Sequence, residues 1–329
     1  MEENTQLRMD LTAFSEKIVQ LRESINKVIV GQDGAVDMLL TAILADGHVL
    51  LEGVPGVAKT LLARLLSRLI DARFSRLQFT PDLMPSDVLG TTVFNMKTSE
   101  FDFHAGPVFS DLVLVDEINR APAKTQAALF EVMEERQATI DGITHSMGSL
   151  FTVIATQNPV EQEGTYKLPE AQIDRFMMKI VIGYPSLDDE VLILQRHQQN
   201  AALVRLDDVK PVLSKENLLH FRDMMSQVLV EESLLRYMIQ LVQLTRTHKA
   251  VYLGASPRAA VALLRASKAF AMLQGRDFVT PDDVKAVAPA VLQHRLFLTA
   301  EAEMEGLGSA RVVSDLLKTV DVPKYTTPT

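Results

Sequence analysis

The chain has 329 residues, of which 47% are hydrophobic and 23% are charged, an ordinary composition for a globular protein of one large or two modest domains. Its 33 basic and 42 acidic residues give a net charge of -9, which argues against a protein whose main task is to coat nucleic acid. The lack of cysteine excludes disulfides, thiolate catalysis and Cys-based zinc sites. No apolar run approaches the roughly 20 residues that span a membrane, and the acidic start does not resemble a secretion signal, so we expect a cytoplasmic protein.

Apolar residues recur at alternating spacings of four and three from Leu7 to Val28, which predicts an amphipathic helix. Such a stripe can form a coiled-coil seam with a partner, but this one spans only about three heptads. We therefore favour a helix within residues 1–30 that packs on the protein's own core.

From residue 48 onward, short apolar runs alternate with helical stretches, a pattern typical of βαβ units around a parallel sheet. We expect strands at residues 48–52, 74–79, 112–115, 151–156 and 178–182, and we expect helices at residues 61–66 and 125–135. Because the strands are continuously apolar, we expect both faces of the sheet to be covered. Residues 31–185 are thus predicted to form an α/β domain.

The pattern changes after the turn at residues 183–186, and the rest of the chain is predicted to be purely helical. The expected helices lie near residues 187–203, 214–227, 231–246, 257–274 and 281–293. Thr280 and Pro281 form a strong helix start, with Thr280 as the N-cap. Residues 186–329 are therefore predicted to form an all-α domain that ends in a loose tail.

A glycine-rich loop between the first strand and the next helix has the context of a phosphate-binding loop. Its residues are Gly53, Val54, Pro55, Gly56, Val57, Ala58, Lys59 and Thr60, and Leu61 completes the set expected to bind ATP. Lys59 is expected to contact the β- and γ-phosphates, and the Thr60 hydroxyl is expected to ligate Mg²⁺. Ala58 stands where the general pattern has glycine, and we expect its methyl group to fit only if the residue keeps an ordinary negative φ.

Two carboxylates, Asp116 and Glu117, end the third predicted strand. Asp116 can hold the Mg²⁺ hydration shell, and Glu117 can polarise the attacking water. An apolar strand that ends in Asp-Glu is a weak signal alone, but it becomes strong about 55 residues after a phosphate loop.

Asn158 follows the fourth predicted strand. If that strand lies between the first and the third, Asn158 projects between the phosphate loop and the two carboxylates, where it could orient the water. It could equally be a turn amide before Pro159, and its position in the sequence does not decide between the two.

Taken together, these motifs resemble the MoxR family of AAA+ ATPases over nearly the whole chain. The residues that carry the resemblance are Val30-Gly31-Gln32, the loop from Leu51 to Thr60, Asp116-Glu117-Ile118-Asn119-Arg120, Ala155-Thr156-Gln157-Asn158-Pro159, the segment from Leu168 to Phe176, and Ala255-Ser256-Pro257-Arg258. Alanine before the lysine is similar to that family's usual form of the loop. Residues 91–110 look like the helix-2 insert of this AAA+ branch, and residues 137–148 look like its β-hairpin before the fourth strand.

The resemblance implies a P-loop core whose five-stranded parallel sheet has the order 5-1-4-3-2, followed by a C-terminal all-α lid. It implies that Val30, Gly31 and Gln32 line the adenine pocket and that Asn158 is the first sensor.

The resemblance also gives roles to two arginines. It implies that Arg175 is an arginine finger, which reaches the γ-phosphate in a neighbouring subunit, and that Arg258 is the second sensor. Without the family, Arg175 reads as a surface partner of Asp174 or Glu170, and Arg258 reads as a solvated residue that opens a helix.

The function implied by the resemblance is that of an oligomeric Mg²⁺-dependent ATP hydrolase, expected to be a hexamer in ring or spiral form. It would remodel or mature a client protein, with a von Willebrand factor A domain protein as the expected partner. Two alternatives stay open, a nucleic-acid motor like the related MCM helicases and an ATPase subunit of a metal chelatase. The acidic balance and the hairpin tip at residues 141–144, which has no Lys or Arg, speak against the first.

Overall fold

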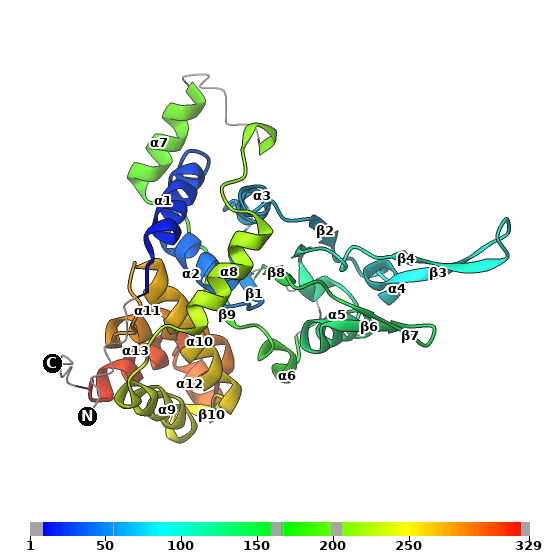
Figure 1. Ribbon diagram of the computed structural model, residues 1–329. Coiled ribbons are helices and arrows are strands. Elements are labelled where there is room, and N and C mark those ends of the chain that lie inside the picture. The colour runs from blue at the N-terminus through cyan, green and yellow to red at the C-terminus, as the bar shows by residue number, and fades with distance from the viewer. Residues whose placement is uncertain (1–8, 55, 159–165, 167, 199–205, 324–329) are drawn as a thin grey trace, which may run out of the picture. The chain divides into compact units, whose positions relative to one another are not determined.

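The computed structural model describes residues 9–54, 56–158, 166, 168–198 and 206–323 (Figure 1). The chain divides into two compact units. The sheet unit is Ser24–Leu219, and the helical unit joins Met1–Glu23 to His220–Thr329. These limits differ from the domain boundaries expected at residues 30 and 185, and the division into 1–30, 31–185 and 186–329 remains a prediction.

Five parallel strands form the main sheet of the sheet unit. They are β1 (Val49–Glu52), β2 (Phe74–Gln78), β5 (Leu112–Asp116), β8 (Thr152–Gln157) and β9 (Met178–Val181). Their order is β2-β5-β8-β1-β9, which confirms the predicted order 5-1-4-3-2 read from the opposite edge. The carboxyl ends of β5, β8 and β1 therefore lie side by side, with β8 in the middle.

Helices cover the sheet and explain its continuous apolar strands. The main ones are α2 (Asp33–Leu44), α3 (Lys59–Leu69) and α5 (Ala123–Glu135). Each residue of β5 is buried. Alternate side chains of this strand share one hydrophobic cluster with Leu129 and Phe130 of α5, and α3 also packs against the strand. A strand packed in this way has no solvent-facing positions, so the alternation of apolar and polar residues is absent.

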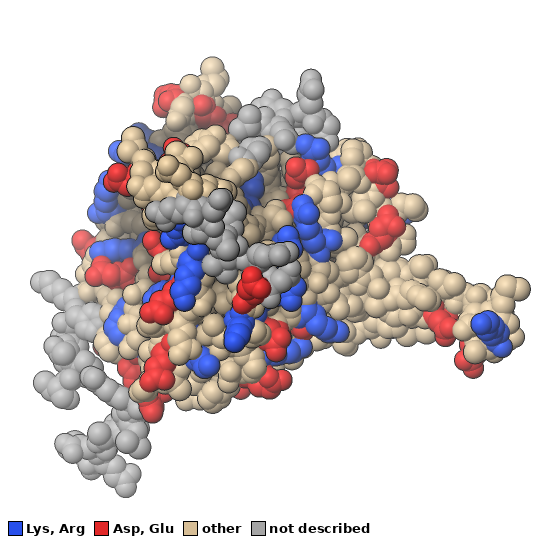
Figure 2. Space-filling view, turned by 90° about the horizontal axis from the view of Figure 1, so that it is seen from above, with Lys and Arg blue, Asp and Glu red and all other residues tan. Residues whose placement is uncertain are grey.

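Two antiparallel hairpins extend the sheet unit. They are formed by β3 (Gly90–Asn95) with β4 (Glu100–Ala105), and by β6 (Gln137–Ile140) with β7 (Ile143–Ser146). They lie where the insert 91–110 and the hairpin 137–148 were expected. The ring of Phe103 stacks on His145 with centroids 4.0 Å apart, so the hairpins contact each other. In Figure 2 the arm of β3 and β4 is mostly uncharged, with charged side chains gathered near its tip.

Further helical segments belong to the sheet unit. They are α4 (Pro85–Leu89), η1 (Ile118–Arg120), α6 (Glu170–Ile173), α7 (Leu187–Gln198) and η2 (Leu206–Asp208).

The helical unit contains most of the remaining elements. These are α9 (Glu232–Thr247), β10 (Val251–Leu253), α10 (Pro257–Leu273), α11 (Pro281–Leu292), η3 (Gln293–Arg295), β11 (Phe297–Leu298), α12 (Ala300–Met304) and α13 (Ser309–Thr319). Thr280 caps α11 as predicted, in a capping box with Asp283. Among the described residues, no helix combines the length and the apolar composition needed to cross a membrane.

The expectation of a purely helical second half was wrong at one place, where β10 pairs with β11 in a two-stranded antiparallel sheet. The two strands are short, and three elements separate them along the chain. No local alternation of apolar and polar residues could therefore reveal their pairing.

The N-terminal stripe forms the predicted helix, α1 (Thr12–Asn26). Within the helical unit, Leu11, Phe14, Ile18 and Leu21 are buried. Phe14 packs edge-on against Phe221 of α8 (Lys215–Ser226), with ring centroids 4.9 Å apart. The stripe therefore packs on the protein's own core, as favoured over a coiled-coil seam.

Asp111, just before β5, is a buried carboxylate held by two cations. Its Oδ1 accepts from Lys215 Nζ at 2.6 Å, and its Oδ2 accepts from the backbone N–H of Arg73 at 3.0 Å and lies 3.4 Å from Arg73 Nε. Burial acts to raise the pKa of Asp111, but Lys215 and Arg73 together hold that pKa below its ordinary value. The carboxylate therefore stabilises the fold above its ordinary pKa, and this contribution is lost as the pH falls through the lowered pKa.

Replacing Asp111 with asparagine should destabilise the protein by about 2 kcal/mol at pH 7, because two charge-assisted hydrogen bonds are weakened. The difference from the parent protein should shrink as the pH is lowered below 4, because the parent carboxyl then becomes protonated. Unfolding curves at several pH values measure this difference. Asp315→Asn, at a half-exposed position of α13, is the control, and a difference that does not vary with pH would contradict the assignment.

Candidate functional site

The loop between β1 and α3 needs glycine at two places. A Cβ on Gly53 would lie 2.6 Å from the carbonyl oxygen of Ile182, and Gly56 has φ +88. Lys59 opens α3, and its Nζ donates to the carbonyl oxygen of Gly53, across the loop. The loop therefore closes on itself around the lysine. Pro55 lies outside the described residues.

The expectation that Ala58 keeps a negative φ was wrong. Ala58 has φ 61 and is the left-handed residue from which α3 begins, since its carbonyl oxygen accepts from the N–H of Leu62 at 2.9 Å. An alanine in this region costs about 1 kcal/mol, which explains why glycine is usual at this position. The close turn into α3 requires a left-handed residue at position 58, and alanine adopts that conformation despite its cost.

Asp116 ends β5 and accepts from three side chains. Thr60 Oγ1 and Thr156 Oγ1 each lie 3.3 Å from its Oδ1, and Arg76 Nε donates to its Oδ2 at 2.6 Å. Asp116 is buried. Its carboxylate is therefore held in place between the phosphate loop, β8 and β2.

Glu117 lies beside Asp116 in a strained backbone conformation, with φ 57. Its N–H donates to Thr156 Oγ1 at 3.0 Å. Its Oε2 accepts from Gln78 Nε2 at 2.8 Å and lies 3.1 Å from Arg120 Nε. A non-glycine residue with positive φ costs energy, and this region holds two of them, Ala58 and Glu117.

A pocket of about 400 Å³ joins these groups. It is lined by Gly56, Ala58, Lys59, Thr60, Leu61, Arg76, Gln78, Asp116, Glu117, Thr156 and Asn158. Asn158 is buried and follows β8, so it lies between the loop after β1 and the carboxylates after β5. The position predicted for Asn158 required the fourth strand to lie between the first and the third, and β8 does lie between β1 and β5.

Two lining residues, Arg76 and Gln78, were not singled out from the sequence, and Thr156 was named there only as part of the motif that contains Asn158. Arg76 and Gln78 are two apart on β2, and Gln78 is in register with Asp116. Side chains two apart on a strand share a face, so this pair of polar residues in a strand was a usable signal. The signal pointed to the site only once the register between β2 and β5 was known, because that register places Gln78 beside Asp116.

The predicted adenine-pocket residues lie elsewhere in the sheet unit. Gln32 Nε2 donates to the carbonyl oxygen of Gly183 at 3.1 Å. A Cβ on Gly31, which has φ +72, would meet the Asp189 carboxylate at 2.5 Å. Val30, half-buried, precedes them. These three residues are not among the described residues that line the pocket, and their adenine contact stays a prediction.

Arg175 also lies outside the described lining of the pocket. Its Nε lies 3.3 Å from Glu134 Oε2, and its guanidinium lies 5.9 Å from the ring centroid of Phe130. Arg175 therefore forms an ion pair, as the alternative reading expected. Its carboxylate partner is Glu134, whereas the sequence suggested Asp174 or Glu170.

Arg258 is exposed in the first turn of α10, where its N–H donates to the capping Ser256 Oγ at 3.2 Å. It belongs to the helical unit, and its contact with nucleotide remains a prediction.

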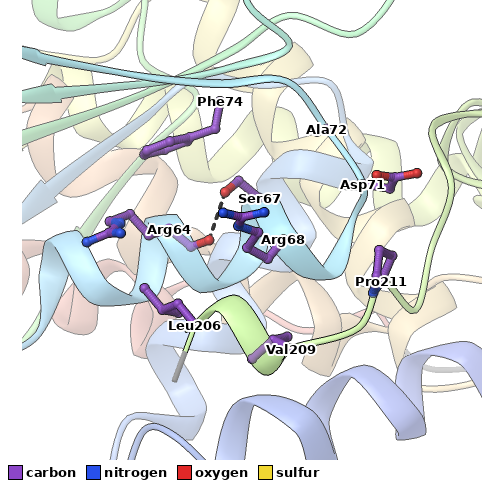
Figure 3. A pocket seen from close by; sticks show the side chains of 9 residues that line it. All are labelled: Arg64, Ser67, Arg68, Asp71, Ala72, Phe74, Leu206, Val209 and Pro211. Carbon is purple, nitrogen blue, oxygen red and sulfur yellow. Dashed lines mark hydrogen bonds between the residues drawn. The ribbon is translucent and has the colours of Figure 1, made fainter. Parts of the chain in front are cut away.

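A second pocket, of about 360 Å³, lies along the outer face of α3 (Figure 3). Its walls include Arg64, Ser67 and Arg68 of α3, Phe74 of β2, and Val209. It has no glycine loop, and Asp71 is its only acidic lining residue among those described. The first pocket therefore has the residues expected of a nucleotide site, and the second pocket does not.

This chain is similar to known AAA proteins in two segments and to MoxR proteins over nearly its whole length. Residues 48–178 match the ATPase family associated with various cellular activities (AAA), and residues 243–316 match the AAA lid domain. Chaperone MoxR1 of Mycobacterium tuberculosis is 44% identical over 309 residues, which cover 91% of this chain and 81% of that protein. Protein MoxR of Methylorubrum extorquens is 32% identical over 333 residues, covering 94% of this chain and 95% of that protein.

A crystal structure from Cytophaga hutchinsonii, assigned as an ATPase, superimposes with a TM-score of 0.87 at 42% identity, covering 95% of this chain and 97% of that one. The fold, the pocket and these relatives lead to one conclusion. The chain belongs to the MoxR family of AAA+ ATPases.

Proposed function

We propose that the protein hydrolyses ATP to ADP and phosphate with the help of Mg²⁺, and that it does so as a head-to-tail oligomer. The observation that supports this most is the single pocket that joins the phosphate loop, Lys59, Thr60, Asp116 and Glu117. Its volume of about 400 Å³ lies in the range of cofactor sites.

The residues present fit magnesium. Thr60 Oγ1 and Asp116 Oδ1 lie 3.3 Å apart, and Mg²⁺ prefers such oxygen ligands. Among the described residues there is no group of three or more acidic or histidine side chains that could hold a metal by itself. Thr60 and Asp116 would therefore share the ion with the nucleotide phosphates, where it would neutralise their charge.

The other residues of the pocket would bind the phosphates and activate the attacking water. Lys59 binds the β- and γ-phosphates, and the loop N–H groups surround them. Glu117 polarises the attacking water, and Gln78 and Arg120 keep its carboxylate in one orientation. Asn158, which lines the same pocket as Glu117, orients the same water.

Arg175 supports the oligomeric part of the proposal, because it lies outside the pocket of its own chain. Its guanidinium would act on the γ-phosphate bound to a neighbouring copy, and such a heterologous contact, when repeated, gives a ring if the rotation closes and a spiral if it does not. Val30, Gly31 and Gln32 would contact the adenine, and Arg258 would act as second sensor.

Hydrolysis would drive remodelling or maturation of a client protein in the cytoplasm. The name of the Mycobacterium tuberculosis relative, a chaperone, supports this role. A protein with a von Willebrand factor A domain remains the expected partner.

Mixing two inactive variants tests the shared site. Lys59→Ala removes the phosphate contact, and Arg175→Ala should lower kcat by about 10³-fold. In an equal mixture, about a quarter of the junctions combine an intact loop with an intact arginine, so about a quarter of the parent activity should return if sites act independently. Steady-state phosphate release measures the recovery.

Arg136→Ala is the matched control for Arg175→Ala. Arg136 also pairs with a carboxylate in the sheet unit, Asp46 at 2.8 Å, and its side chain is 34% exposed against 28% for Arg175. The control should keep the parent activity. A mixture that stays inactive would contradict a site shared between copies.

A further inference from the structure

The ion pair between Arg76 and Asp116 lies inside the pocket assigned to ATP. The two side chains come from neighbouring strands, β2 and β5, and Arg76 Nε lies 2.6 Å from Asp116 Oδ2. The Asp116 side chain is 8% exposed, whereas that of Arg76 is 51% exposed. A buried carboxylate is therefore paired with a guanidinium that has room to move.

Asp116 is also the carboxylate that would hold Mg²⁺. Its Oδ1 already accepts from Thr60 and Thr156, which leaves Oδ2 as the oxygen bound by Arg76. A guanidinium in contact with the carboxylate and a divalent cation at the same carboxylate repel each other strongly over such a short distance. Full contact of both with Asp116 at one time is therefore unfavourable.

We propose that Arg76 competes with Mg²⁺ for Asp116 and, when displaced, donates to the phosphate groups of the nucleotide. This inference rests on the proposed function of the pocket.

The charges of the pocket favour this exchange. Among its described lining residues, Lys59 and Arg76 balance Asp116 and Glu117. A nucleotide with its magnesium adds net negative charge, which a released guanidinium can offset. The planar fork of arginine suits phosphate oxygens, and Arg76 lines the same pocket as Lys59 and Thr60.

The first test measures Mn²⁺ as a magnetic probe for Mg²⁺, in the absence of nucleotide, by electron paramagnetic resonance. Arg76→Ala should bind Mn²⁺ about tenfold more tightly than the parent protein, because the competitor is gone. Arg76→Gln should behave like Arg76→Ala and serves if the alanine variant does not fold, whereas Arg76→Lys should stay near the parent affinity. Unchanged Mn²⁺ affinity in Arg76→Ala and Arg76→Gln would overturn the proposal.

The second test measures ATP binding in the presence of Mg²⁺ by calorimetry. Arg76→Ala should weaken it about tenfold, because phosphate contacts are lost. The two readouts therefore move in opposite directions. A residue that only supports Asp116 would weaken the binding of both Mn²⁺ and ATP when removed, and that result would overturn the proposal.

Arg73→Ala is the matched control. Arg73 pairs with the buried Asp111 in the same unit, outside the described lining of the pocket. It should change neither Mn²⁺ nor ATP binding. A parent protein that binds no ATP would refute the proposed function, whereas the Mn²⁺ measurement involves no nucleotide and tests the competition separately.

Discussion

Replacing Glu117 with glutamine is expected to lower the rate of ATP hydrolysis by about 10³-fold while ATP still binds. Glutamine has the same shape, and its carbonyl oxygen can still accept from Gln78, which lies 2.8 Å from Glu117 Oε2. It cannot take a proton from water. Single-turnover hydrolysis together with calorimetric ATP binding separates the chemical step from binding.

The same variant should accumulate as an ATP-bound oligomer, since the bound nucleotide is not consumed. Size-exclusion chromatography with ATP checks this, and proteins captured with the variant identify a client by mass spectrometry. Glu131→Gln, exposed on α5 and outside the described lining of the pocket, is the control. Hydrolysis at the parent rate in Glu117→Gln would refute the role given to Glu117.

Replacing Lys59 with alanine should remove measurable nucleotide binding, with a Kd at least about 100-fold higher than that of the parent protein. The Lys59 ammonium group donates to the carbonyl oxygen of Gly53 within the loop, and charge-assisted contacts to phosphate are the strongest that this pocket offers. A loss of about 3 kcal/mol corresponds to this change in Kd. Calorimetry with ATP and with ADP measures it.

Arg68→Ala is the control for Lys59→Ala, because it removes a positive charge from the same helix at the second pocket (Figure 3). It should leave the Kd for ATP within about twofold of the parent value. Equal losses in both variants would mean that α3 as a whole, and not the lysine, governs binding.

The strands that build the site could be recognised from sequence because each of them ends in its own motif, whereas their order in the sheet was implied only by the family resemblance. The glycine loop marks β1, the Asp-Glu pair marks β5 and Asn158 marks β8. Once the order of these strands is known, parallel pairing brings their carboxyl ends to one edge of the sheet. The pocket that contains Asn158 follows from that geometry.

Ala58 shows where residue type misleads. An alanine favours negative φ in isolation, yet the turn that leads into α3 holds it at φ 61. The surrounding loop and helix determine the conformation, and the penalty of about 1 kcal/mol is small compared with their packing. Arg175 gives a similar lesson, since its partner Glu134 lies on α5 and not in its own segment.

Local sequence alone specifies the phosphate loop, the paired carboxylates and the capped helices, because each depends on residues a few positions apart. Three features depended on the tertiary structure: the contact of Arg76 and Gln78 with the carboxylates, the pairing of β10 with β11, and the packing of Phe14 of the α1 stripe against Phe221 of α8. These features depend on the register and packing of segments far apart in the chain, which many residues determine together and no single motif encodes. The separate motifs of the candidate site can therefore be predicted from sequence. The ion pair between Arg76 and Asp116, on which the proposed competition rests, could be identified only from the tertiary structure.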